Sequence, residues 1–124
     1  IYAVNPKLIL LGLAGSKLLT AAKKTGLRIA QEVFADRAYE EDGSLVARNK
    51  AGAMITDETE AIARVISMIK MQRVQAITGK EIAVKADSIC LHGDSPKAVL
   101  FAQKIRSALQ NEGIKIAAMH EFVE

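Results

Sequence analysis

The sequence is poor in cysteine and aromatic residues, with one cysteine, no tryptophan and 4% aromatics among 124 residues. A single cysteine cannot form an internal disulfide, so the cysteine content does not point to an oxidising compartment. The longest apolar run, residues 8–13, falls far short of the roughly 20 residues that a membrane-spanning helix needs. No basic segment precedes this run, which argues against a signal peptide. We therefore expect a cytoplasmic protein that does not associate with membranes.

Clustered charge is also scarce. The net charge is +3, and Lys23-Lys24 is the only adjacent pair of basic residues. Proteins that bind nucleic acids usually carry a concentrated basic face with aromatic residues for stacking, so we expect no nucleic-acid partner. Half of the residues are hydrophobic and a quarter are charged, which is typical of a globular chain. We expect residues 1–124 to form a single domain.

Short apolar runs alternate with helical patterns, which is typical of βα units and a largely parallel sheet. The runs predict strands at residues 7–13, 27–34, 88–91 and 114–118. The helical patterns predict one helix at residues 17–25, one after Asp57 and one from Pro96 to Gly113. Residues 35–51 form a long polar loop, and residues 71–85 are ambiguous, with a possible short edge strand at 82–84. This α/β pattern fits a small doubly wound sheet or half of a larger βα barrel.

Residues that can cap helices stand at the predicted helix starts. Ser16 can accept a hydrogen bond from a free N–H of the first helix. Asp57, with Glu60 three residues later, resembles a capping box. Ser95 or Asp94 could cap the last helix, with Pro96 at its first position.

One candidate site follows the second predicted strand, at the carboxyl end where α/β proteins place ligands. Glu32 and Asp36 share a face if this strand continues, and Arg37 and Tyr39 follow directly. These residue types together can bind a carboxylate substrate or perform acid–base chemistry. The alternative is a surface pair of Asp36 and Arg37 at the start of a loop.

A second candidate site is His92-Gly93-Asp94, directly after the strand at residues 88–91. A histidine and an aspartate at a strand tip could hold a metal or polarise a substrate, and Gly93 would let a ligand approach the backbone. In the alternative interpretation, Asp94 caps the following helix and His92 is an exposed loop residue.

Two further residues are weaker candidates. Arg48, in the polar loop, could reach a phosphate or carboxylate, although such residues are more often solvated. Cys90 lies within a strand and fits a structural thiol better than a nucleophile. The chain contains neither GxxxxGK[ST] nor GxGxxG, so it carries no visible nucleotide-binding motif.

Several stretches resemble signatures of the LamB/YcsF family. Residues 32–39 read E-V-F-A-D-R-A-Y, and residues 42–46, Arg48 and residues 52–53 follow with matching spacing. Residues 89–98 read I-C-L-H-G-D-S-P-K-A, where the family typically reads I-C-V-H-G-D-x-P-x-A. Residues 11–16 and 26–28 also fit. The resemblance covers nearly the whole chain in order.

The resemblance implies a βα barrel similar to that of polysaccharide deacetylases. It also implies a subunit of the prokaryotic 5-oxoprolinase, which hydrolyses the lactam of 5-oxoproline to L-glutamate with ATP and with partner subunits B and C. The earlier family motifs D-L-N-C-D, H-P-G-Y-P-D and K-P-H-G-A-L-Y are absent. We therefore expect the C-terminal half of a barrel, inactive without the missing N-terminal half. Its open strand edges favour a homodimer.

The resemblance also implies roles around the mouth of the barrel. Asp36, His92, Glu32 and Asp94 are expected to be catalytic, with Asp36 or His92 orienting the water or lactam. The expected substrate-binding residues are Arg37, Tyr39, Arg48 and Gly93. A divalent metal remains possible.

Two other functions stay open at this point. The related fold also supports a deacetylase-like, metal-assisted hydrolase of amides or carbohydrates. The chain could instead be a non-catalytic α/β module that completes a partner chain.

Overall fold

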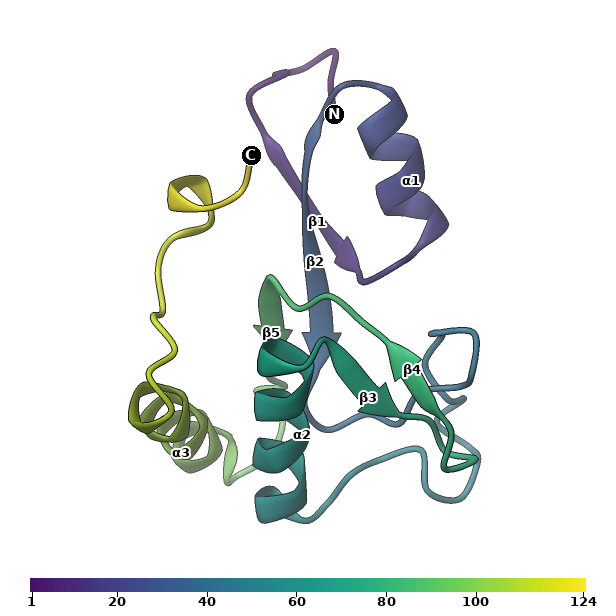
Figure 1. Cartoon of the computed structure of the whole chain (residues 1–124), viewed down its shortest axis with the longest axis vertical. Coiled ribbons are helices and arrows are strands. Elements are labelled where there is room, and N and C mark those ends of the chain that lie inside the picture. Colours follow the sequence, from purple (N-terminus) through teal and green to yellow (C-terminus); the bar gives the residue numbers. More distant parts are fainter.

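A computed structural model describes residues 1–124. Three strands form a parallel sheet in the order β1-β2-β5, and two form an antiparallel hairpin, β3-β4. Figure 1 shows β2 running through the middle of the molecule, with α1 at one end and α2 and α3 near the other. The elements are β1 (Ile9–Leu13), α1 (Lys17–Lys24), β2 (Arg28–Phe34), α2 (Glu58–Lys70), β3 (Arg73–Gln75), β4 (Glu81–Ala83), β5 (Ser88–Cys90), α3 (Ala98–Asn111) and the 3-10 turn η1 (Met119–Glu121).

Helix α1 packs on β1 and β2 much as its sequence predicts. The Ser16 hydroxyl accepts a hydrogen bond from the Leu19 N–H and caps the helix. Leu19 is buried against the sheet, and a Cβ at Gly12 would meet its Cδ2 atom at 3.0 Å. Glycine at position 12 therefore lets the helix approach β1 closely. Gly26 lies in the turn between α1 and β2, and its positive φ of 87° is a conformation that suits glycine.

Helix α2 covers the other end of the same sheet face. The Asp57 carboxylate accepts from the Glu60 N–H at 2.8 Å, which confirms the predicted cap. Val65 and Met68 are fully buried in one cluster with Val33 and Ala35, next to β2 and its end. This cluster also takes in Ile105 and Leu109 from the predicted buried stripe of α3, and it forms the main core.

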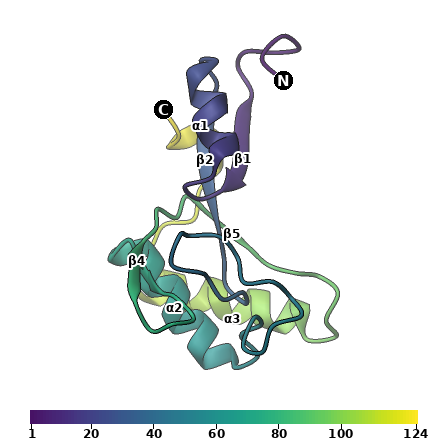
Figure 2. The ribbon, with the colours of Figure 1, turned by 90° about the vertical axis from the view of Figure 1, so that its right-hand side faces the viewer.

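The helices leave one face of the sheet uncovered. Side chains alternate along a strand, and Gly12 and Val33 point toward the helices. Glu32 and Phe34 therefore lie on the opposite face, together with Leu11 of β1, which is 39% exposed. Leu11 and Phe34 belong to none of the apolar clusters. Figure 2 shows α1 and α2 with the sheet from a second direction.

The last helix differs from its prediction. Helix α3 begins at Ala98, and Lys97 at its N-cap makes no side-chain capping bond. Ser95 instead accepts from the Lys97 N–H at 3.2 Å, and its carbonyl accepts from the Ala98 N–H. Because Ser95 closes this turn ahead of the helix, neither Asp94 nor Ser95 caps α3, and Pro96 precedes it.

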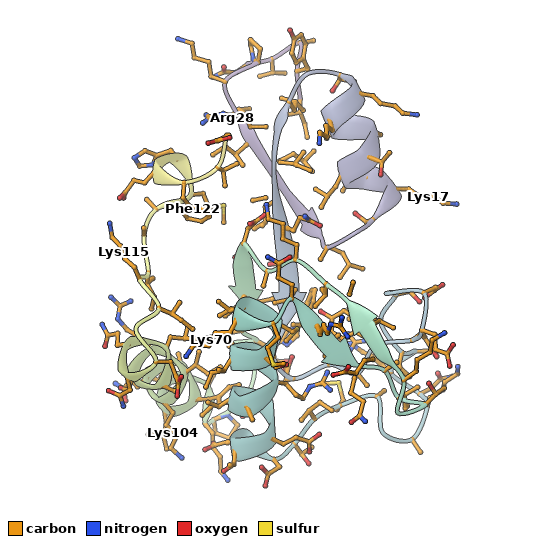
Figure 3. All side chains as sticks on the ribbon, in the orientation of Figure 1. Lys17, Arg28, Lys70, Lys104, Lys115 and Phe122 are labelled. Atoms are coloured by element: carbon orange, nitrogen blue, oxygen red, sulfur yellow. The ribbon has the colours of Figure 1, made fainter.

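The predicted strand at residues 114–118 is wrong, because this segment is irregular and ends in η1. The Ile114 N–H bonds back to the Leu109 carbonyl of α3, which ties the segment to the helix end. Its apolar side chains Ile114, Ile116 and Ala117 line a groove with α3 and β5, so the apolar pattern marks the wall of a groove and not a strand. At the chain end, Arg28 donates to the Val123 carbonyl at 3.4 Å, and Figure 3 shows Arg28 and Phe122 in the same region.

The ambiguous residues 71–85 contain the β3-β4 hairpin, whose second strand lies one residue earlier than the predicted edge strand. The polar loop at 35–51 is also ordered, with isolated bridges between Arg37 and Met54 and between Tyr39 and Leu45. None of the helices has the length and apolar character that crossing a bilayer requires.

Candidate active site

The sheet register brings the two candidate sites together. Strands β2 and β5 are parallel neighbours, with Glu32 opposite Ser88 and Phe34 opposite Cys90. Continuing this register by two residues places Asp36 opposite His92 at the carboxyl ends of both strands. In α/β proteins, this edge of the sheet is where ligands bind.

Asp36 and His92 form a hydrogen-bonded pair. The distance from His92 Nδ1 to Asp36 Oδ2 is 2.7 Å, and the two side chains are 26% and 20% exposed. The His92 ring also stacks on Phe34, with ring centroids 5.9 Å apart and an interplanar angle of 29°. Because Nδ1 is engaged with the carboxylate, Nε2 is the nitrogen left for a substrate or a water molecule.

The second carboxylate oxygen of Asp36, Oδ1, is buried and has no hydrogen-bond partner. A carboxylate bound to one imidazole nitrogen can fix the orientation and tautomer of the ring. This arrangement suits a histidine that takes a proton from a nucleophile, as in general base catalysis.

Glu32 and Cys90 lie on the same uncovered face, Glu32 four residues before Asp36 and Cys90 two residues before His92. Burial is the main cause that raises the pKa of the Cys90 thiol, followed by the negative charges of Glu32 and Asp36 and a hydrogen bond to Glu32. A thiol with a raised pKa stays protonated and is a poor nucleophile. Cys90 is therefore poorly suited to attack a substrate.

Tyr39 is fully buried, and its hydroxyl accepts from the Phe34 N–H at 2.9 Å. Strand β1 ends opposite Glu32, so it offers no carbonyl to the Phe34 N–H. The Tyr39 hydroxyl accepts this hydrogen bond in its place. Burial raises the pKa of Tyr39, with smaller effects from nearby groups. Its hydroxyl thus holds the backbone just before Asp36.

The structure does not bring the two predicted substrate-binding arginines to this pair. Arg37 is 7% exposed, and its guanidinium donates to the Val46 carbonyl at 2.8 Å inside the loop. Arg48 is exposed on the far part of that loop and shares no hydrogen bond or ion pair with Asp36 or His92.

Gly93 and Asp94 follow His92 on the exposed surface. A Cβ at Gly93 would meet nothing within 4 Å, so the backbone there is open to a ligand. Asp94 makes no hydrogen bond to His92, whose carboxylate partner is Asp36.

The donor set of this chain does not fit a complete metal site. No group of three or more His, Cys, Asp or Glu side chains gathers closely enough to hold a metal ion. Asp36 and His92 alone supply two donors, whereas protein metal sites usually have three or four.

Sequence reasoning missed two residues near the pair. Phe34 could have been found from its place on the same strand face as Glu32. Arg64 of α2 donates to the Arg37 carbonyl at 2.9 Å, and its helical position gave no signal of this contact.

The fold and the site together define an α/β protein whose parallel strands present a carboxylate–histidine pair at their carboxyl ends. The model of the LamB/YcsF family matches residues 1–124, so the chain belongs to this family. The resemblance of the motifs at residues 32–39 and 89–98 is thereby confirmed.

Curated relatives support the same family assignment. The chain is 60% identical over 122 residues to a Clostridium beijerinckii protein named as the A subunit of 5-oxoprolinase, covering 98% of this chain and 48% of that protein. It is 53% identical over 123 residues to a Campylobacter jejuni protein of the same name, covering 99% of this chain and 48% of the relative. The chain therefore spans about half the length of these relatives.

A solved structure shares the fold. The lactam utilization protein from Thermus thermophilus superimposes with a TM-score of 0.86 at 38% identity, over 94% of this chain and 46% of that protein. This similarity confirms the α/β fold with parallel strands and helices.

Proposed function

We propose that this chain supplies the Asp36–His92 part of the active site of a 5-oxoprolinase, which hydrolyses the lactam of 5-oxoproline to L-glutamate. The observation that carries the proposal is the 2.7 Å contact between Asp36 and His92 at the carboxyl ends of adjacent parallel strands. The names of the relatives, a 5-oxoprolinase subunit and a lactam utilization protein, point to the same chemistry.

The pair suits the hydrolytic step. Asp36 holds His92 through Nδ1, and Nε2 takes a proton from the water that attacks the lactam carbonyl carbon. The C–N bond of the ring then breaks, and the oxygen of the water becomes part of the new carboxylate. The proton that Nε2 took passes to the nitrogen, which leaves as the amine. Glu32, on the same uncovered face, is placed to bind a polar group of the substrate.

ATP and the partner subunits belong to the assembled enzyme in this proposal. The chain carries no phosphate-binding motif, so we assign nucleotide binding to other parts of a complex with subunits B and C. The relatives are named as one subunit of the enzyme, which is consistent with a multi-subunit assembly.

We further propose that the sheet is part of a βα barrel. All its helices pack on one face, while Leu11, Glu32 and Phe34 line the other. Strands β1 and β5 each pair on one side only. A barrel would pair both outer edges with strands of the other half of the protein and turn the uncovered face inward.

The test is glutamate formation from 5-oxoproline and ATP by the intact protein with subunits B and C. We expect Asp36→Asn and His92→Ala each to lower kcat by roughly 10²–10⁴-fold, the usual contribution of a positioned base. Both variants should stay folded, and the melting temperature should fall most in His92→Ala, which removes the hydrogen bond to Asp36. Matched controls are Asp42→Asn in an exposed turn and His120→Ala in η1, which should keep full activity.

Full activity in both site variants would contradict the assignment. Turnover that requires a divalent metal but no ATP would indicate the deacetylase-like alternative. A folded, assembled protein with no turnover under either condition would favour the non-catalytic module.

A further inference from the structure

Arg64 is a half-buried cation of α2 that forms no salt bridge, although the charge of Glu60 one turn earlier acts on it. Its guanidinium donates to two backbone carbonyls, that of Arg37 at 2.9 Å and that of Gln75 at 3.5 Å. Its Nε is buried without a hydrogen-bond partner, and none of the salt bridges of the chain involves Arg64. Burial is the main cause that lowers the pKa of this guanidinium.

A charged group in this position is costly for the fold. Removing a cation from water without a salt bridge is unfavourable, and an apolar side chain of similar length would fill the space at less cost. The packing of α2 on the core already comes from Val65 and Met68. The need for an arginine at position 64 must therefore lie in the bonds that it makes.

The stronger of these bonds is made to the peptide between Arg37 and Ala38, one residue beyond Asp36. The Ile55 N–H donates to the Asp36 carbonyl at 2.8 Å, and the Ala38 N–H donates to the Ala53 carbonyl at 2.9 Å. Between these two bonds, Arg37 sits in an antiparallel bridge with Met54. In such a non-hydrogen-bonded pair, the carbonyl of the middle residue points away from the partner strand.

The Arg37 carbonyl therefore needs a partner from outside the loop, and Arg64 supplies it. The hairpin joins the same network, because the Ile77 N–H donates to the Tyr39 carbonyl at 2.8 Å. Helix α2 and the hairpin thus hold the backbone of residues 37–39, directly after Asp36, in place.

We propose that Arg64 is a positioning residue for the Asp36–His92 pair, acting through the Arg37 carbonyl. The proposal rests on the proposed function for its kinetic readout and on the structure alone for its spectroscopic one. Without Arg64, the Arg37 carbonyl loses its donor. The bridge between Arg37 and Met54 is then weakened, and the Asp36 carboxylate shifts from its alignment with Nδ1 of His92.

The test compares Arg64→Met, Arg64→Lys and the control Arg73→Met in the intact protein with subunits B and C. Arg64→Met keeps the length of the side chain but removes the donors, whereas Arg64→Lys keeps one donor. Arg73 lies on the exposed hairpin and pairs only with Glu81. Steady-state kinetics with 5-oxoproline and ATP provide the first readout.

We expect Arg64→Met to lower kcat by about 10- to 100-fold with less than a twofold change in KM, because a displaced catalytic group slows the reaction more than it weakens binding. Arg64→Lys should recover most of that loss, and Arg73→Met should match the parent protein. If Arg64→Met lowers only the melting temperature and leaves kcat unchanged, Arg64 is merely structural and the proposal is overturned.

The second readout is the proton NMR signal of the His92 Nδ1–H, assigned by its loss in His92→Ala. We expect this signal to broaden or move in Arg64→Met and to be kept in Arg73→Met. An unchanged signal would overturn the proposal even if kcat falls. If the parent protein shows no lactam turnover, the proposed function fails, but this signal still tests the role of Arg64.

Should Arg64→Met fail to fold, Arg64→Lys carries the test. We then expect a partial loss of kcat with a shifted His92 signal. Parent-like values of both in Arg64→Lys and in a further variant, Arg64→Gln, would overturn the proposal.

Discussion

The carboxyl ends of β2 and β5 hold their catalytic candidates in different ways. Beyond β2, residues 35–55 are fixed by backbone bonds that join Asp36 to Ile55 and Ala38 to both Ala53 and Val46. Beyond β5, residues 93–97 are exposed, and the turn there is closed by bonds to Ser95.

This difference gives the two members of the pair unequal roles. Asp36 is placed by its own segment, through bonds that do not involve His92. The His92 ring hydrogen-bonds to Asp36 and stacks on Phe34, both from the β2 side. The orientation of the imidazole therefore depends on the β2 side, whereas the backbone of Asp36 is held without the imidazole.

The sharpest test of this asymmetry compares Asp36→Ala with His92→Ala by amide chemical shifts. A hydrogen bond to a charged group contributes about 1.5–3 kcal/mol, so Asp36→Ala should free the His92 ring and shift the amides of residues 92–97. In His92→Ala, the amides of residues 37–39 should keep their positions. Equal disturbance on both sides would contradict the unequal roles.

A smaller effect is expected where Tyr39 supports β2. Tyr39→Phe removes the hydroxyl that accepts from the Phe34 N–H and leaves a buried donor unpaired, which should lower the free energy of unfolding by about 1–2 kcal/mol. Urea denaturation of the intact protein measures this change. The control Tyr2→Phe, at an exposed position, should leave stability unchanged. A loss below a few tenths of a kcal/mol would show that water replaces the hydroxyl.

The smallest effects distinguish the two helix starts. Asp57→Ala removes a capping bond from α2 and should cost about 1 kcal/mol. Ser95→Ala removes a hydroxyl that bonds in a turn ahead of α3, and it should cost only a few tenths. Thermal unfolding of both variants checks the order. A larger loss from Ser95→Ala would mean that the turn before α3 supports the helix after all.

The parts of the fold that could be predicted are those whose signals are local. Ser16 and Asp57 mark their helices because a cap acts within three residues of itself. The buried stripe of α3 follows from helical spacing. The predicted strand at 114–118 failed because an apolar pattern does not show whether a segment has a strand to pair with, and Ile114 and Ile116 line a groove without a pairing partner.

The candidate site was predictable to a similar degree. Family resemblance put Asp36 and His92 at one place, and the register of β2 with β5 brings them into contact. The position of Arg37 could not be foreseen, because its guanidinium bonds to the Val46 carbonyl. Every residue has a backbone carbonyl, so the sequence does not indicate that Arg37 bonds to the carbonyl of Val46. The same is true of Arg64.

The register of the sheet also has a kinetic consequence. Ile9 pairs with Arg28 nineteen positions later, whereas Asp36 and His92 are 56 positions apart. Closing the longer loop costs about 1 kcal/mol more in chain entropy, so the β1–α1–β2 unit is favoured to form before β5 joins it. We expect the amides of β1, α1 and β2 to gain protection from hydrogen exchange early during refolding, and the Asp36–His92 contact to form with the docking of β5. A protein stopped between these two steps would hold α1 against β1 and β2 and would lack the Asp36–His92 contact.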